Sequence, residues 1–328
     1  MATADQVKAL IRCHAEGDDA RFYAVAIQVA AQAARSGHGR FSQELRDLVD
    51  QVKARNSAFE VTRGPKPVPL AQPRGELAGL LTVSYPKTRM ADMALPGVLR
   101  KRIERVLTEQ RERDRLREHG FSPMRKLLLV GPPGTGKTMT AAALAGELGL
   151  PLFSIRLDGL ITKYMGETAA KLRLVFDAIQ ATRGVYLFDE FDALGGERSA
   201  KNDVGEIRRV LNSFLQFLEQ DDSDSIVLGA TNHVDLLDRA LFRRFDVVLE
   251  YSLPEEDIAT RVMRGRLALL DTANLEWNKV AAAAEGLSHA EIVMACEQAA
   301  KNAILKHTTI VSDTELLAAL NERHGTRP

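Results

Sequence analysis

Eight consecutive residues, Gly131-Pro132-Pro133-Gly134-Thr135-Gly136-Lys137-Thr138, match the G-x-x-x-x-G-K-[ST] pattern of a phosphate-binding loop. The apolar run 127–130 before them predicts a buried strand, and residues 139–148 after them predict a helix. Glycines let backbone N–H groups surround a phosphate, and a helix N-terminus adds partial positive charge. Lys137 can reach the β- and γ-phosphates, and the Thr138 hydroxyl can bind Mg²⁺. Because both flanks fit, the motif predicts nucleoside triphosphate binding rather than an accidental glycine-rich turn.

A pair of carboxylates, Asp189 and Glu190, directly follows the apolar run 185–188. A strand with this ending places them at the carboxyl edge of a parallel sheet, beside the phosphate-binding loop. There Asp189 can hold Mg²⁺, directly or through water, and Glu190 can polarise the water that attacks the γ-phosphate. An Asp-Glu dipeptide alone is common on surfaces. Its place after a buried run and downstream of a P-loop favours the catalytic interpretation.

Asn232 ends a further strand-like segment, Gly229-Ala230-Thr231-Asn232. An amide at a strand end can donate a hydrogen bond to the γ-phosphate or to the attacking water. Alone it would be an ordinary turn asparagine, but its place after the fourth predicted strand favours a role in sensing hydrolysis.

Two adjacent arginines, Arg243 and Arg244, precede the last predicted strand. A guanidinium can stabilise charge on a transferring phosphoryl group. The pair lies too far from the P-loop end of the sheet to serve its own nucleotide, so we expect it to project into a neighbouring subunit's site. The alternative is that part of the pair forms structural ion pairs with Asp238 or Asp246.

Strand-like and helical runs alternate from Lys126 onward. Strands are expected at residues 127–130, 152–157, 185–188, 226–230 and 247–251. This alternation predicts an α/β fold with a doubly wound, parallel, five-stranded sheet. In the chain, one strand separates the P-loop strand from the Asp-Glu strand, as in P-loop ATPases with an in-sheet catalytic glutamate. Residues 255–322 and the charged segment 96–119 show helical patterns only.

The domain organisation follows from these patterns. Residues 1–57 carry apolar stripes at helical spacing and predict a small N-terminal all-α module, while residues 58–89 are punctuated by prolines and predict a linker. An α/β ATPase domain is expected over residues 90–253 and a helical domain over residues 254–328.

The charge balance argues against a polyanion-binding protein. Lys and Arg number 44 and Asp and Glu number 44, which gives a formal net charge of +0. The helix expected over residues 96–119 mixes both signs, which favours a solvated helix face over an RNA- or DNA-facing patch. From the charge pattern we expect no nucleic-acid partner. No leader pattern or membrane-spanning apolar run is evident, so we expect a cytoplasmic protein with no membrane insertion.

The four sites, in this order and spacing, resemble the AAA family of ATPases within the AAA+ class, over about residues 90–324. The resemblance implies that ATP and Mg²⁺ are the cofactors, that residues 131–138 are Walker A, and that Met139 also binds the nucleotide. It also implies that Asp189 and Glu190 form Walker B and that Asn232 is sensor 1. Arg243 and Arg244 resemble the arginine fingers, but the Pro-Gly that usually separates them is missing, which leaves open which one reaches across.

The C-terminal helices resemble the lid of the same family. The segment Gly286-Leu287-Ser288-His289-Ala290-Glu291 is similar to the Gly-x-Ser-Gly-Ala-[Asp/Glu] segment that meets adenine and ribose, which implies nucleotide contacts for Ser288 and Ala290. His289 stands where the family usually has glycine. The segment lacks a sensor-2 arginine, which favours the core AAA branch.

Lys163, Tyr164 and Met165 lie where AAA unfoldases carry pore loop 1. The resemblance implies a hexamer whose aromatic residues line a channel and grip an extended polypeptide; the alternative is a tyrosine packed on its own domain. The expected function is therefore an ATP-hydrolysing motor that unfolds or remodels proteins. Any peptidase or adaptor would be a separate partner, bound through the N-terminal helices. The alternatives are a DNA-acting AAA+ motor, a clamp-loader-like ATPase and a slow ATP-gated scaffold.

Overall fold

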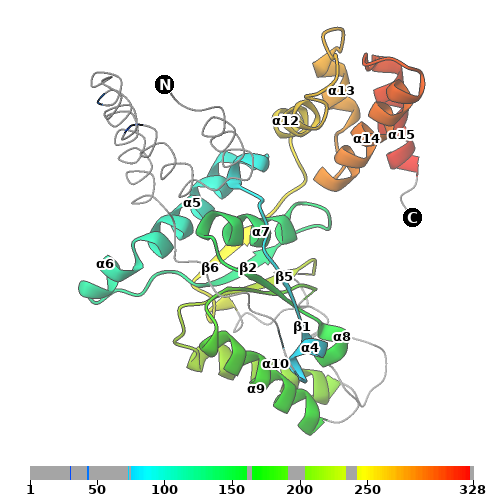
Figure 1. Ribbon diagram of the computed structural model, residues 1–328. Coiled ribbons are helices and arrows are strands. Elements are labelled where there is room, and N and C mark those ends of the chain that lie inside the picture. Colours follow the sequence, from blue (N-terminus) through cyan, green and yellow to red (C-terminus); the bar gives the residue numbers. More distant parts are fainter. Residues whose placement is uncertain are drawn as a thin grey trace. The chain divides into compact units, whose positions relative to one another are not determined.

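A computed structural model of the chain describes residues 75–160, 165–190, 204–233 and 242–325, together with Ala30, Gln43 and Pro73. Apart from Ala30 and Gln43, the expected N-terminal module lies outside the described residues, as do half of the expected linker and Lys163 and Tyr164. The chain divides into two units, Met1–Lys66 and Pro67–Pro328. All the labelled elements in Figure 1 belong to the second unit.

The centre of this unit is a six-stranded sheet with the order β1-β3-β4-β5-β2-β6. The strands are β1 Leu81–Ser84, β2 Lys126–Val130, β3 Leu152–Ile155, β4 Val185–Phe188, β5 Ile226–Thr231 and β6 Val247–Glu250. Strands β2 to β6 pair in parallel, which confirms the expected α/β fold.

The sixth strand, β1, corrects the expected count of five. It lies in the segment assigned to the linker and pairs antiparallel with β3, with Leu81 opposite Ile155 and Ser84 opposite Leu152. Four residues beside a proline carry too weak a pattern to predict a strand by themselves. The strand forms because β3 offers an edge to pair with.

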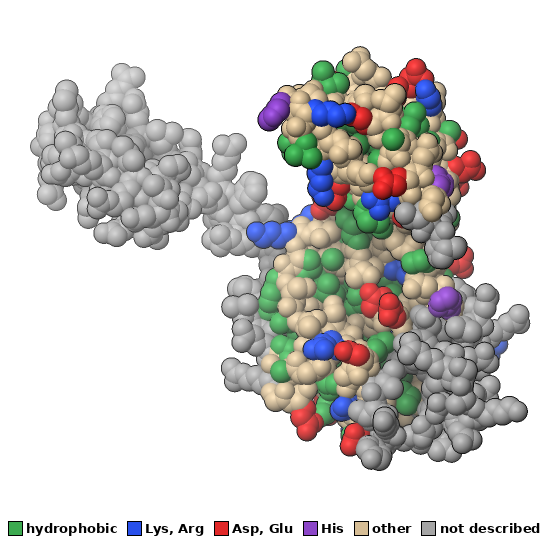
Figure 2. Space-filling model, turned by 90° about the vertical axis from the view of Figure 1, so that its right-hand side faces the viewer, with side chains coloured by type: hydrophobic (Ala, Val, Ile, Leu, Met, Phe, Trp, Pro, Cys, Tyr) green, Lys and Arg blue, Asp and Glu red, His purple; other side chains and the backbone are tan. Residues whose placement is uncertain are grey.

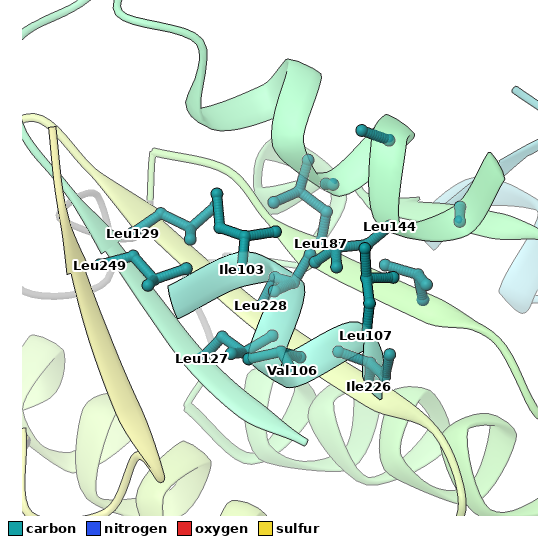
Figure 3. Packing of buried hydrophobic residues seen from close by; sticks show 14 of the residues in the cluster. Ile103, Val106, Leu107, Leu127, Leu129, Leu144, Leu187, Ile226, Leu228 and Leu249 are labelled. Carbon is teal, nitrogen blue, oxygen red and sulfur yellow. The ribbon is translucent and has the colours of Figure 1, made fainter. Parts of the chain in front are cut away.

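Both faces of the sheet are buried, because alternate residues of each strand point to opposite sides. On one side Leu127 and Leu129 of β2 pack with α5 (Gly97–Arg111) and α7 (Lys137–Leu148). Figure 3 shows side chains of α5, including Ile103, lying against Leu127, Leu129 and Leu249 of the strands.

The opposite face is covered by α9 (Met165–Ala181) and α10 (Val204–Gln220) (Figure 1). Three phenylalanines form the centre of this layer. Phe188 meets Phe214 edge-on with ring centroids 4.9 Å apart, and Phe176 lies 5.7 Å from Phe214. Because Phe188 is the last residue of β4, this cluster fixes the strand end that precedes Asp189.

The helix expected over residues 96–119 is two helices. Helix α5 ends at Arg111, and α6 spans Arg113–Glu118. The first buries Leu99, Ile103, Val106, Leu107 and Gln110, whereas the second buries no residue. The two helices therefore separate at the point where the contacts of α5 with the hydrophobic core end. The short elements are α4 Leu77–Leu80, the 3-10 helix Met90–Asp92 and α8 Leu157–Leu160.

The C-terminal part is helical, as expected. Helices α12 (Glu256–Arg266), α13 (Trp277–Ala283), α14 (His289–Leu305) and α15 (Asp313–Gly325) enclose a core of their own. Ala295, Ala299 and Ala303 of α14 are fully buried in it, and such small side chains allow close helix packing.

The surface drawn in Figure 2 mixes both charges. Lys and Arg side chains lie among Asp and Glu side chains there, rather than in a band of one sign. Within the part of the chain that the structure describes, no helix is long and apolar enough to cross a membrane.

Ile103→Ala tests the packing of α5 on the sheet. Ile103 is fully buried, so its truncation should lower the free energy of unfolding by about 2–5 kcal/mol. Val98→Ala on the same helix is the matched control, because Val98 is 70% exposed and should change that free energy by about 0.5 kcal/mol at most. Urea unfolding measures both; equal effects would contradict the packing described here.

Candidate nucleotide-binding and hydrolysis site

The sheet order brings three of the four predicted sites to one edge. Strands β4, β5 and β2 are neighbours and parallel, so the segments after them begin side by side. The carbonyl of Thr231, at the end of β5, accepts a hydrogen bond of 3.3 Å from the Gly131 N–H. Asn232, which follows β5, therefore lies next to the P-loop. Asp189 follows β4, which is the neighbour of β5 on the side away from β2.

The P-loop encloses its lysine. The ammonium of Lys137 donates to the carbonyls of Gly131 and Pro132, both at 2.7 Å, and the residue is 6% exposed. The Thr135 hydroxyl also donates to the Pro132 carbonyl at 2.7 Å. Because α7 begins at Lys137, a buried positive charge and the N–H groups of a helix N-terminus meet in one loop. This arrangement fits a triphosphate.

The predicted metal ligands are in contact. The Thr138 hydroxyl donates to Oδ2 of Asp189 at 2.8 Å, across the gap between the first turn of α7 and the end of β4. A hydroxyl and a carboxylate are hard oxygen donors, which Mg²⁺ prefers. The donor set therefore fits Mg²⁺ shared with phosphate oxygens.

Glu190 has an unusual backbone conformation. Its φ is +51°, in the left-handed region that non-glycine residues rarely occupy, and its side chain is exposed. Its N–H donates to Oδ1 of Asp189 at 3.0 Å, which helps to hold the turn. Strain of this kind costs about 1–3 kcal/mol and concentrates at functional sites. It supports a functional role for this carboxylate.

The two arginines differ in their surroundings. Arg244 forms an ion pair with Glu219 of α10, whereas Arg243 is exposed and has no ion-pair partner among the described residues. Arg244 thus forms a structural ion pair, but with Glu219 rather than with the expected Asp246. Asp246 instead accepts backbone N–H groups of Arg125 and Lys126 at 2.8 and 2.9 Å, and Asp238 lies outside the described residues.

The structure does not bring the arginines to the P-loop. Within the described residues, no hydrogen bond or ion pair links Arg243 or Arg244 to residues 131–138. Among the residues that the structure describes, the P-loop thus encloses the ammonium of Lys137, and neither Arg243 nor Arg244 is bonded to it.

The predicted lid residues do reach the loop. The Ala290 N–H donates to the Gly134 carbonyl at 3.0 Å, and Ser288 caps α14 by accepting from the Glu291 N–H at 3.3 Å. Gly134 has φ +72°, and a Cβ on it would lie 2.7 Å from Oγ of Ser288. Only glycine permits this approach, so the N-terminus of α14 packs directly on the P-loop.

His289 makes a contact that the sequence did not predict. Its Nε2 lies 3.1 Å from the Ala94 carbonyl, and Met93 beside it approaches Gly136 of the P-loop. Since the partner is a carbonyl, Nε2 carries the proton. Burial lowers the pKa of His289, with the hydrogen bond opposing part of that change, so the ring is neutral at neutral pH. The histidine therefore joins the helical domain to the segment before α5.

A second contact missed by the sequence joins Thr140 of α7 to Tyr251, which follows β6. Their hydroxyl oxygens lie 2.6 Å apart in a buried position. The sequence offered one indication of this contact: Thr140 and Tyr251 carry hydroxyl groups at positions where the hydrophobic pattern of the helix and of the strand predicts apolar side chains. Nothing in that pattern indicates that the two residues meet, because 111 positions separate them.

Comparisons with known proteins agree with this geometry. Residues 127–253 match the model of the ATPase family associated with various cellular activities (AAA). The uncharacterized AAA family ATPase y4kL of Sinorhizobium fredii is 32% identical over 322 residues, which cover 98% of this chain and 96% of that protein.

Other relatives match over part of their length. The ATP-dependent zinc metalloprotease FtsH 3 of Sphaerobacter thermophilus is 31% identical over 76% of this chain and 52% of its own. The proteasome-activating nucleotidase of Methanoregula boonei is 33% identical over 62% of this chain and 48% of its own. The chain thus spans about half the length of these two proteins.

Among solved structures, the crystal structure of the FIGL-1 AAA domain matches with a TM-score of 0.60 and 25% identity, over 74% of this chain and 85% of that one. The match of nearly full length, the Walker A loop and the carboxylate pair beside it lead to one assignment. The chain belongs to the AAA family of ATPases, and its activity is ATP hydrolysis.

Proposed function

We propose that this ATPase remodels or unfolds proteins, and that it acts as a ring of identical subunits, a hexamer, in the cytoplasm. The observation that carries the assembly is that Arg243 is exposed and has no ion-pair partner among the described residues, while neither it nor Arg244 is bonded to the P-loop. Relatives named as a proteasome-activating nucleotidase and as a metalloprotease support a protein substrate.

The hydrolytic roles follow from the contacts at the sheet edge. Lys137 balances the charge of the β- and γ-phosphates, and Thr138 and Asp189 hold Mg²⁺. When bound, Mg²⁺ supplies positive charge against the phosphate oxygens. Glu190 accepts a proton from the attacking water, and Asn232 orients that water or the γ-phosphate. The adenosine contacts Met139, which is 41% exposed, together with Ser288 and Ala290 beside Gly134.

The structure favours Arg243 over Arg244 as the arginine finger. Glu219 already neutralises Arg244, so moving that guanidinium to another subunit would leave a carboxylate without its partner. Arg243 has no such tie among the described residues and is exposed. We propose that Arg243 completes the nucleotide site of the neighbouring subunit, which makes hydrolysis depend on assembly.

Lys163, Tyr164 and Met165 are proposed to contact the protein substrate. Helix α9 begins at Met165, so Tyr164 directly precedes a helix. An aromatic ring and a flexible thioether together give a large apolar surface that adapts to many side chains. Residues 1–57 are proposed to recruit an adaptor or a separate peptidase, ahead of a linker that is shorter than expected because α4 and β1 occupy residues 77–84.

Glu190→Gln should separate binding from hydrolysis. We expect it to bind ATP as the wild type does and to lower turnover by about a hundredfold or more, because glutamine cannot accept the proton. Equilibrium binding and phosphate release measure the two effects. Glu250→Gln removes an exposed carboxylate at the end of β6 and should leave both unchanged. Proteins retained by the Glu190→Gln variant in ATP then identify the substrate; turnover at the wild-type rate would contradict the role of Glu190.

Mixing inactive variants tests the finger in trans. Arg243→Ala should lower turnover about a thousandfold. Its mixture with Glu190→Gln should regain activity, because an intact Glu190 then meets an intact Arg243 at some interfaces. Asp189→Asn mixed with Glu190→Gln is the control without recovery, since both changes lie on the same side of the interface. No recovery with Arg243→Ala, or recovery with Arg244→Ala instead, would refute the choice of Arg243.

Tyr164→Ala tests the substrate contact. We expect basal hydrolysis to persist and stimulation by an unfolded protein to disappear, whereas Tyr164→Phe should retain both because the ring is kept. Phosphate release with unfolded protein, folded protein or DNA, each alone, measures the effect. Stimulation by DNA only would replace this proposal with a DNA-acting motor.

A further inference from the structure

Tyr251 lies where the sheet ends and the connection to the C-terminal helices begins. Its N–H donates to the Val130 carbonyl at 2.7 Å, so it extends the pairing of β6 with β2 by one residue. It is 6% exposed, and α12 begins five positions later, at Glu256. The residue is therefore fixed to the P-loop strand on one side and attached to the lid on the other.

The hydroxyl of Tyr251 reaches the far end of the P-loop through Thr140. The Thr140 hydroxyl donates to the Gly136 carbonyl at 3.0 Å and lies 2.6 Å from the Tyr251 oxygen. Either hydroxyl can donate in the bond between them, and Tyr251 is the donor when the single hydroxyl proton of Thr140 lies on the Gly136 carbonyl. Burial raises the pKa of Tyr251, so the phenol keeps its proton throughout the working range of pH.

The backbone of Tyr251 also confines the first residue of the loop. Gly131 has φ +144°, and a Cβ on it would lie 2.2 Å from the Tyr251 carbonyl oxygen. No side chain fits there. The carbonyl of Gly131 in turn accepts from the Lys137 ammonium. One residue thus contacts the start of the P-loop directly and its end through a hydrogen-bond relay.

The lid itself also contacts the P-loop, through the start of α14. The Ala290 N–H at the start of α14 donates to the Gly134 carbonyl. The P-loop, Tyr251, the connecting segment 252–255 and the lid helices therefore form a closed series of contacts. A rotation of the lid that is not absorbed by segment 252–255 therefore strains the Tyr251 relay or breaks the contact at Gly134.

We propose that Tyr251 is a positioning residue for ATP hydrolysis, which shapes the P-loop through Gly131 and the Thr140–Gly136 relay and transmits nucleotide binding to the lid. By reciprocity, a lid held by a neighbouring subunit changes the affinity of the P-loop for nucleotide. The role of Tyr251 rests on the ATPase activity and does not depend on the nature of the substrate, whereas the effect of a neighbouring subunit rests on the proposed ring.

Tyr251→Phe removes the hydroxyl and keeps the ring. We expect the Kd for ATP to rise about fivefold, the equivalent of one lost hydrogen bond. Thr140→Val should have a similar effect, and the double variant should be no worse than either single one, because both changes break the same relay. Thr140→Ser keeps the hydroxyl and should restore wild-type affinity.

Tyr186→Phe is the matched control. Tyr186 is also buried, and its hydroxyl proton is shared between the carbonyls of Ala178 and Thr182, 2.9 and 2.8 Å from the phenol oxygen and away from the P-loop. It should lose a comparable amount of stability in urea unfolding and bind ATP as the wild type does. If Tyr251→Phe only destabilises the fold to this extent and leaves the Kd unchanged, Tyr251 is a structural residue and the proposal is wrong.

Amide hydrogen exchange at saturating nucleotide provides the readout for the lid. In the wild type and in Tyr186→Phe, we expect ATP to slow exchange in residues 251–256 and at the start of α14. In Tyr251→Phe and Thr140→Val this protection should be lost even though the site is full. Protection that persists in both variants would overturn the coupling, whatever their Kd values.

Discussion

The parallel register of β4, β5 and β2 is the constraint on which the site depends. Each strand is buried on both faces, so a shift of one residue would turn leucines and phenylalanines from one core into the other. This register puts the Gly131 N–H on the Thr231 carbonyl and, one strand further, allows Thr138 to meet Asp189. The loops after the strands carry the reactive groups, and the two hydrophobic layers on either side of the sheet fix the positions of these loops.

The sequence predicted the strands that consist mainly of apolar residues. Strands β2 to β6 are runs of apolar residues, and such runs specify a buried parallel strand without help from their neighbours. Strand β1 and the break at Glu112 were missed because each depends on a tertiary partner. The first needs the free edge of β3, and the second marks where the core beneath α5 ends.

The same distinction separates the contacts of the candidate site that the sequence predicted from those that it did not. Thr138 and Asp189 could be brought together by reasoning, because the ends of parallel strands share one edge of the sheet. The ion pair of Arg244 with Glu219 and the contact of His289 with Ala94 join distant segments, and no periodicity encodes such pairs. A single sequence shows that these residues are polar. It does not show what they meet.

Two features of the described residues fit the proposal that a neighbouring subunit completes the site. Glu190 is held in a strained conformation with its carboxylate exposed, and Arg243 is left exposed beside an arginine that is already paired. A self-contained ATPase would gain by placing such a guanidinium on its own phosphates, where the low dielectric strengthens the attraction. An enzyme whose hydrolysis must wait for a neighbour has a physical reason to keep both groups facing outward. Tyr251 and Ala290 contact the P-loop from the side of the lid. In the proposed coupling, these contacts transmit nucleotide binding at the P-loop to the lid.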